Sequence, residues 1–210
     1  NSDGNRGDQL GATVTGSDGS YTVSVDSAAG AVEVVVSGGS YEDEATGKTV
    51  ELGKELRSMV SDVSQGQQVA VTALTEIAAE HANENADDGL DTAIENAKKK
   101  VATEFGLGSD FDISEVQPSD LAQGPASGKS ADYGAVLAGI SQRIQNAKDN
   151  GKNVSASDVP TLVKDMAKDF SNDGKFNGDA GSKALELASE ITPSEAKEGL
   201  QEAMRNFMNS

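Results

Sequence analysis

Oxygen-bearing side chains alternate with other residues late in the chain, from residue 169 to residue 177. A calcium-binding loop requires this spacing, because alternate residues of such a loop supply the oxygen ligands. Gly174 falls at the sharp turn of the pattern, but Ala180 stands where a bidentate Glu would complete it. Two interpretations follow: a weakened Ca²⁺ site, and a plain helix–helix turn that uses Asp and Gly for backbone reasons. The predicted ligands are Asp169, Ser171, Asp173, Asn177 and the carbonyl oxygen of Lys175.

A second oxygen-rich segment opens the chain with the sequence Asn-Ser-Asp-Gly-Asn-Arg-Gly-Asp. Its alternating side-chain oxygens also suit a hard cation. The predicted ligands there are Asn1, Asp3, Asn5 and Asp8. Ca²⁺ is therefore the one cofactor that the sequence suggests.

Motifs for catalysis are absent from the sequence. The single histidine, His81, shares a helical face with Leu74 and Ile77, which indicates a structural role. The chain has no zinc-protease, nucleophile-elbow, phosphate-loop or dinucleotide-binding motif. The run Glu-Asp-Glu at 42–44 could supply a carboxylate pair for glycoside hydrolysis, although an acidic turn is the simpler interpretation. We therefore predict a protein that is not an enzyme, with a hydrolase of unrecognised carboxylate site as an alternative.

Charge and composition narrow the classes of partner. The 210 residues include 35 acidic and 17 basic side chains, for a net charge of −18, and no Cys. Such a charge repels nucleic acid and anionic membranes, and no apolar run approaches the ~20 residues of a membrane span. The chain starts without Met or a signal peptide, so we expect a processed mature chain or a fragment.

Alternating apolar residues predict β structure up to about residue 72. Strands are expected at 21–25, after an Asp18-Gly19 turn, and at 31–36, 49–52 and 68–71. The apolar period then changes to that of helices, with a long connection at 107–130. About six helices are expected from these stripes, and we predict a β module at 1–72 and a helical domain at 73–210, which is an α+β fold. The predicted helical stripes lie at 74–81, 90–105, 133–144, 162–170, 185–191 and 192–208, the last one opening with a Thr-Pro-Ser-Glu capping box.

The β part resembles the transthyretin-like or carboxypeptidase-regulatory-like immunoglobulin-type modules of bacterial surface proteins, and later segments resemble the helical region that follows such modules. This class implies a secreted or cell-surface location and a β-sandwich followed by a helical bundle, and it implies no activity. The residues that carry the resemblance are Gly11-Ala12-Thr13-Val14-Thr15, residues 17–23, 39–47 and 71–76, Tyr133-Gly134-Ala135-Val136-Leu137-Ala138, and residues 169–178.

The resemblance also predicts an incomplete sandwich. Such modules have one or two further strands before the Gly-Ala-x-Val segment, but nine residues precede Leu10 here. A strand from another copy could fill the groove, which predicts a self-assembling fibre or matrix subunit. A fragment that lacks its first strand is the competing interpretation. A monomeric adhesin or ligand-binding module stabilised by Ca²⁺ is the alternative function.

Overall fold

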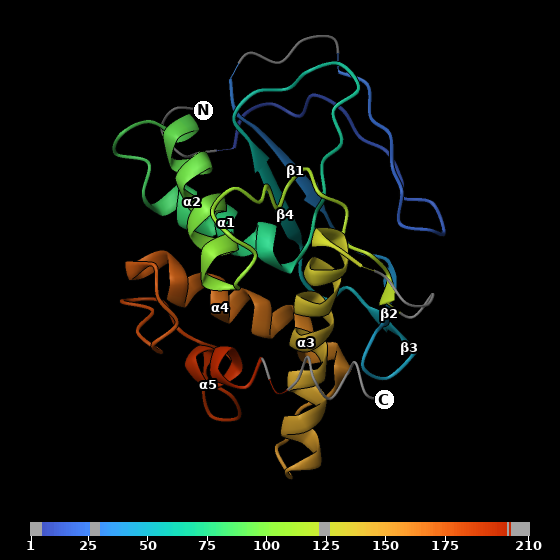
Figure 1. Ribbon diagram of the computed structural model, residues 1–210, viewed down its shortest axis with the longest axis vertical. Coiled ribbons are helices and arrows are strands. Elements are labelled where there is room, and N and C mark those ends of the chain that lie inside the picture. The colour runs from blue at the N-terminus through green and yellow to red at the C-terminus, as the bar shows by residue number, and fades with distance from the viewer. Residues whose placement is uncertain (1–5, 26–29, 122–126, 201, 203–210) are drawn as a thin grey trace.

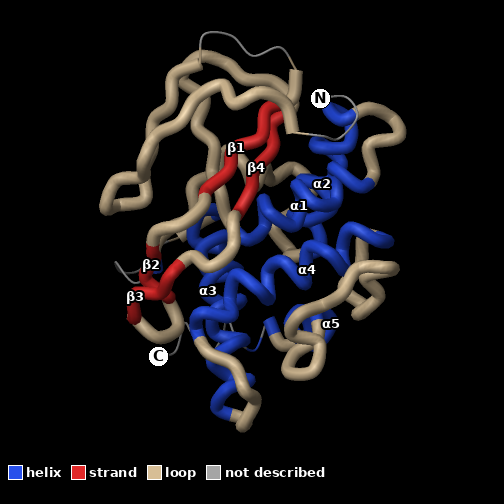
Figure 2. Tube along the Cα trace, turned by 180° about the vertical axis from the view of Figure 1, so that it is seen from behind, coloured by secondary structure: helices blue, strands red, loops and turns tan. Residues whose placement is uncertain are grey.

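The computed structural model describes residues 6–25, 30–121, 127–200 and 202. Within these residues the protein is of mixed α and β structure, with five α-helices and two small two-stranded sheets. The β1–β4 sheet and long loops lie at the upper end of the molecule with α1 and α2 beside the sheet, and α3, α4 and α5 lie below them (Figures 1 and 2). The α+β class is thus confirmed.

Both sheets are antiparallel pairs. In the first sheet Val32 lies opposite Val60 and Val36 lies opposite Leu56. The second sheet is a hairpin whose ends are aligned so that Ser40 lies opposite Glu51. The strands are β1 (Val32–Val36), β2 (Ser40–Asp43), β3 (Lys48–Glu51) and β4 (Leu56–Val60).

The helices follow the strands along the chain. Thr72 caps the first helix by accepting a hydrogen bond from the backbone N–H of Thr75, and Thr192 caps the last one through Glu195. Gly174 ends the fourth helix in the left-handed conformation, with φ of 76°, which glycine adopts without strain. The helices are α1 (Ala73–Glu84), α2 (Leu90–Glu104), α3 (Lys129–Asp149), α4 (Val159–Asp173), preceded by the 3-10 helix η2 (Ala156–Asp158), and α5 (Pro193–Glu198).

The core is aliphatic and centres on α1, which packs against α2, α4 and β4. Leu74 and Ile77 of α1 are fully buried, as are Leu162 and Phe170 of α4. Met59 of β4 belongs to the same hydrophobic cluster as these helices. The strand and helix segments therefore share one core, and the predicted division at residue 72 stays a prediction.

Several predicted elements are confirmed by the structure. The strands expected at 31–36 and 49–52 correspond to β1 and β3. The stripes at 74–81, 90–105, 133–144 and 162–170 correspond to α1, α2, α3 and α4. The capping box opens α5, and the segment predicted to continue it lies mostly outside the described residues.

Other predictions are wrong. Residues 21–25 and 68–71 are not strands, and the described chain forms neither a sandwich nor a bundle of six helices. Residues 185–191 are irregular, because the backbone N–H groups of Glu186 and Leu187 donate to the buried carboxylate of Asp165. The strand β4 was not predicted, because Leu-Arg-Ser-Met-Val does not alternate.

Candidate functional site

The two strands of the β1–β4 sheet differ at their outer edges. The backbone N–H of Arg57 donates to Oε2 of Glu76 at 2.8 Å, so this group of β4 points away from β1. Opposed residues of an antiparallel pair alternate between bonded and non-bonded pairs, so Arg57 and its partner Val35 form a non-bonded pair. Val35, and Glu33 two residues before it, therefore direct their backbone N–H and C=O groups away from β4.

This outer edge of β1 has no strand partner among the described residues. Among the described residues, no segment other than β4 makes a backbone hydrogen bond with β1. The exposed fraction of Val35 is 38%. The opposite edge of the sheet is different, because α1 covers β4 there with the carboxylate of Glu76. Unpaired edge groups of this kind are a template for another strand.

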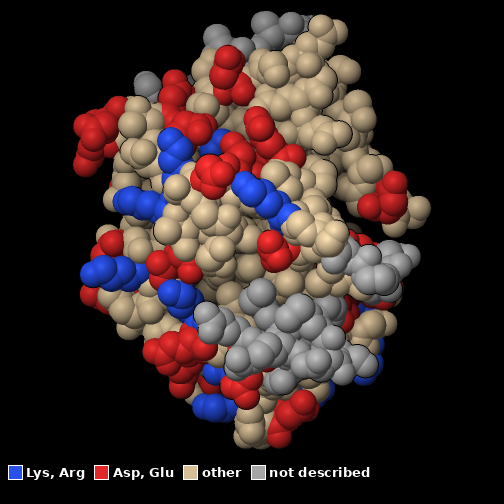
Figure 3. All heavy atoms as spheres, viewed as in Figure 1, with Lys and Arg blue, Asp and Glu red and all other residues tan. Residues whose placement is uncertain are grey.

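Two long loops lie at the same end of the molecule and are almost free of charge. Asp18 is the only charged residue in 9–25, and 63–71 contains none, although 25% of the chain is charged. Figure 3 shows mixed red and blue side chains over the helices and a broad area with few charges at the upper right. Among the described residues, four large apolar side chains are exposed, all in the β part: Leu10 (47%), Val14 (88%), Val23 (39%) and Val35 (38%).

The loop 9–25 has the shape of a hairpin without its ladder. The predicted turn at Asp18-Gly19 is present, since the N–H of Gly16 donates to the carbonyl of Ser20 at 2.8 Å. A Cβ atom on Gly11 would lie 2.7 Å from Cγ2 of Val23, so the two arms run side by side. No backbone hydrogen bond joins the described arms to each other beyond the turn, or to another described segment. The backbone groups of the arms thus have no backbone partner among the described residues, while the hydroxyl of Tyr21 donates to the carbonyl of Val69 at 2.6 Å.

A buried ion network holds β4 to the helices. The carboxylate of Glu76 is fully buried and accepts hydrogen bonds from the guanidinium of Arg57 at 2.6 Å and from Lys164 of α4 at 2.8 Å. Arg57 also donates to Glu80 at 2.6 Å, and Lys183 reaches Glu80 at 3.0 Å. Burial alone would lower the pKa of Arg57, but hydrogen bonds to Glu76 and Glu80 and their charges outweigh it and raise this pKa. The network leaves no carboxylate oxygen of Glu76 exposed, so its role is structural.

The three acidic residues at 42–44, which the hydrolase hypothesis would use, lie at the β2–β3 hairpin. Asp43 is buried, and its Oδ1 accepts from the N–H and hydroxyl of Thr46. Burial, with the charges of Asp43 and Asp120, raises the pKa of Glu44 to about 7. Glu42 is exposed and points to the other face of β2, so the three acidic residues do not converge.

His81 is a core residue, as its helical spacing predicted. It is 3% exposed and packs against the ring of Phe170, with centroids 5.1 Å apart. Its Nδ1 lies 3.2 Å from the carbonyl of Phe170, and its Nε2 lies 3.1 Å from Nζ of Lys100. These partners fit a neutral ring that donates at Nδ1 and accepts at Nε2. Burial first, and then the charge of Lys100, lower the pKa of His81.

The predicted calcium ligands at 169–177 are only partly brought together. Asp169, Ser171 and Asp173 lie in the last turns of α4, and not in a loop, so alternate residues point to different faces. The hydroxyl of Ser171 donates to the carbonyl of Lys168 and accepts from Lys183. Asn177 donates from Nδ2 to Asp173, and Lys175 donates its backbone N–H to the same carboxylate. Among the described residues, no three His, Asp or Glu side chains form a group suited to a metal ion.

The second predicted cation loop cannot be located in the same way. Asn1, Asp3 and Asn5 lie outside the described residues, and Asp8 is exposed. Calcium binding at this segment stays a prediction.

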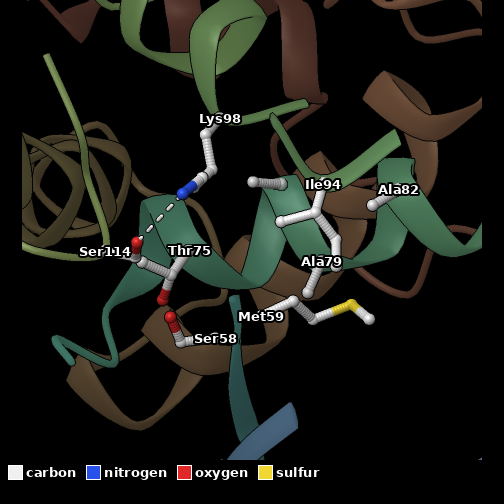
Figure 4. A pocket seen from close by; sticks show the side chains of 9 residues that line it. Ser58, Met59, Thr75, Ala79, Ala82, Ile94, Lys98 and Ser114 are labelled. Carbon is white, nitrogen blue, oxygen red and sulfur yellow. Dashed lines mark hydrogen bonds between the residues drawn. The ribbon is translucent and has the colours of Figure 1, made fainter. Parts of the chain in front are cut away.

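Two hollows in the described part of the molecule bear on the hydrolase hypothesis. The first, of about 10 Å³, lies between β4, α1 and α2, and has room for about one water molecule (Figure 4). Lys98 lies at its side and donates to Ser114 at 3.4 Å. The second, of about 620 Å³, lies between β3, the end of α3 and η2; Glu51 is its one carboxylate among the described lining residues. Neither hollow offers the carboxylate pair that the hydrolase hypothesis requires.

Neither the residues of the ion network nor the open edge of β1 are among those predicted from the sequence. Glu76 stands between Leu74 and Ile77 in an apolar stripe, and a charge within such a stripe was an available signal of a buried pair. No comparable signal marked Arg57, because β4 was not predicted.

Comparisons with known proteins give no match to this chain among protein-family models, curated proteins or solved structures. Among the residues that the structure describes, no helix has both the length and the apolar character needed to cross a membrane.

Proposed function

We propose that the chain is a non-enzymatic structural protein of the cell surface or the extracellular space that assembles with copies of itself by β-strand addition. The observation that carries this proposal is the open outer edge of β1 beside loops that carry almost no charge. The surface location rests on the resemblance described above.

The accepting edge is defined by Glu33 and Val35. Both direct backbone donors and acceptors away from β4, at a spacing of two residues. A strand that pairs there gains main-chain hydrogen bonds without breaking a backbone hydrogen bond between β1 and a described segment other than β4. The charge of Glu33 does not oppose the partner, because Arg6 donates to its carboxylate at 2.8 Å.

The donating strand is the segment from Leu10 to Val14 of a second copy. Leu10 and Val14 are the most exposed large apolar side chains described, and alternation places both on one face of an extended strand. Donor and acceptor are different surfaces of the same chain. Such a head-to-tail contact leaves one unused donating strand and one unused accepting edge on every assembly. Repeated addition therefore produces a filament, unless the rotation between successive copies closes a ring.

Sedimentation velocity over a range of concentrations tests the proposal. The wild-type protein should form larger species as its concentration rises. Val35→Pro removes a backbone N–H that makes no hydrogen bond between β1 and β4, and this variant should stay monomeric. The matched control Val35→Thr keeps that N–H and should assemble. A wild-type protein that stays monomeric at every concentration, or a Val35→Pro variant that assembles equally well, would contradict the proposal.

The location requires a separate experiment. Protease treatment of intact cells that produce the protein should remove it, and a cytoplasmic marker protein should survive. Complete protection of the protein would contradict a surface location without bearing on assembly.

A further inference from the structure

Two buried carboxylates lie one turn apart on α4 and differ in their partners. Asp165 is fully buried and accepts hydrogen bonds from the N–H groups of Glu186 and Leu187 at 2.9 and 2.7 Å. Asp169 is equally buried, but neither of its oxygens has a hydrogen-bond partner among the described residues. The second carboxylate is therefore the exception on this helix.

The surroundings of Asp169 do not compensate its charge. The backbone N–H groups of Asn177 and Gly178 face it and favour its ionised form, but they do not reach hydrogen-bond geometry. Burial has the larger effect and, with the nearby charges of Asp173 and Asp179, raises the pKa of Asp169. A buried carboxylate without a partner costs several kcal/mol, so the group must either hold a proton or bind a cation.

The loop that follows α4 offers oxygen atoms to a cation. Asp173 lies one turn beyond Asp169 on the same side of the helix, and its carboxylate faces Asn177. Asn177 also presents its amide oxygen, which accepts from the N–H of Asp179 at 2.9 Å. These are carboxylate and amide oxygens on a short irregular segment, the kind of ligands that Ca²⁺ accepts in flexible geometry.

We propose that Asp169 is the inner ligand of a Ca²⁺ site completed by Asp173 and the loop 174–181. No three acidic side chains converge there, so amide or carbonyl oxygens and water complete the coordination. Ser171 is not a ligand, because the ammonium group of Lys183 donates to its hydroxyl at 2.8 Å. The site thus differs from the spacing that the sequence alone predicted.

Calorimetric titration and thermal unfolding with CaCl₂, beside MgCl₂, test the site. At a Ca²⁺ concentration about a hundred times the dissociation constant, the Tm of the wild-type protein should rise by about 5 to 10 °C. Asp169→Asn should abolish both the heat of binding and this rise. Asp88→Asn, a matched change at an exposed carboxylate before α2, should keep both.

Asp169→Asn is expected to fold, because the substitution removes a buried charge and leaves the shape of the side chain unchanged. Without Ca²⁺, Asp169→Asn should melt above the wild-type protein at pH 7. Asp173→Asn provides a second variant and should weaken Ca²⁺ binding at least tenfold. Two results would overturn the proposal: no heat and no Tm shift at millimolar Ca²⁺, which leaves Asp169 as a protonated carboxyl, or a Ca²⁺ response that persists in Asp169→Asn.

Discussion

Arg57 binds Glu76 through both its backbone and its side chain. The backbone N–H donates to Oε2 at 2.8 Å, and the guanidinium donates to Oε1 at 2.6 Å. One carboxylate therefore neutralises a charge and also closes the outer edge of β4. Because α1 closes that edge, further strand pairing in this sheet is directed to the edge of β1.

Glu76→Gln should lower the free energy of unfolding by about 3 kcal/mol. The amide keeps the shape of the side chain but removes the charge that Arg57 and Lys164 share in a buried setting. Urea denaturation at pH 7 measures the change. The control is Lys54→Met, which breaks a partly exposed pair with Glu186 and should cost less than about 1 kcal/mol. Equal effects of the two variants would mean that the buried network does not stabilise the fold.

Val14→Lys should weaken self-association at least tenfold, which corresponds to about 1.4 kcal/mol. The added charge sits in the proposed donor strand and must be desolvated on pairing. Because Val14 is 88% exposed, the Tm of the Val14→Lys variant as a dilute monomer should equal that of the wild-type protein. Val14→Thr keeps the branched side chain and is the matched control. Association of Val14→Lys with wild-type strength, measured by sedimentation, would exclude residues 10–14 as the donor.

Much of the helical part could be predicted from the sequence, but little of the sheet could. Apolar residues such as Leu74 and Ile77 recur with the helical period, and local N-caps such as Thr192 mark where a helix begins. Strand pairing depends on residues far away in the sequence, and residues 21–25 alternate like a strand although they find no partner within the described chain. The alternation at 21–25 therefore indicates an extended local conformation, but it does not show whether the segment pairs with another strand.

The candidate sites show a similar contrast. The sequence pointed to Asp169 and Asp173 by spacing, and the structure puts both on α4 with one of them buried and unpaired. The pattern could not show that Ser171 would be used by Lys183, because these residues meet only in the fold. The resemblance predicted an unfilled groove in the β part, but nothing in the sequence placed the open edge at β1, since its place depends on which strand pairs with Val35.

Glu44 should make stability depend on pH near neutrality. Burial raises its pKa from 4.5 to about 7, so the folded state binds the proton more tightly than the unfolded state. The stabilisation from this proton is complete below pH 4.5 and is lost as the pH rises through 7. Glu44→Gln should therefore be more stable than the wild-type protein by about 1 to 2 kcal/mol at pH 8, and similar to it at pH 4. Urea denaturation at the two pH values measures both differences, and a constant difference would contradict the assignment.

Amide hydrogen exchange at Val35 tests the central claim most directly. In dilute monomer the N–H of Val35, which has no acceptor within the described chain, should exchange rapidly, whereas that of its neighbour Val34, which faces β4, should be protected. In concentrated, assembled samples the Val35 amide should become about as protected as the Val34 amide. In the Val14→Lys variant the Val35 amide should stay unprotected. A Val35 amide that exchanges equally fast in dilute and assembled samples would contradict strand addition at this edge.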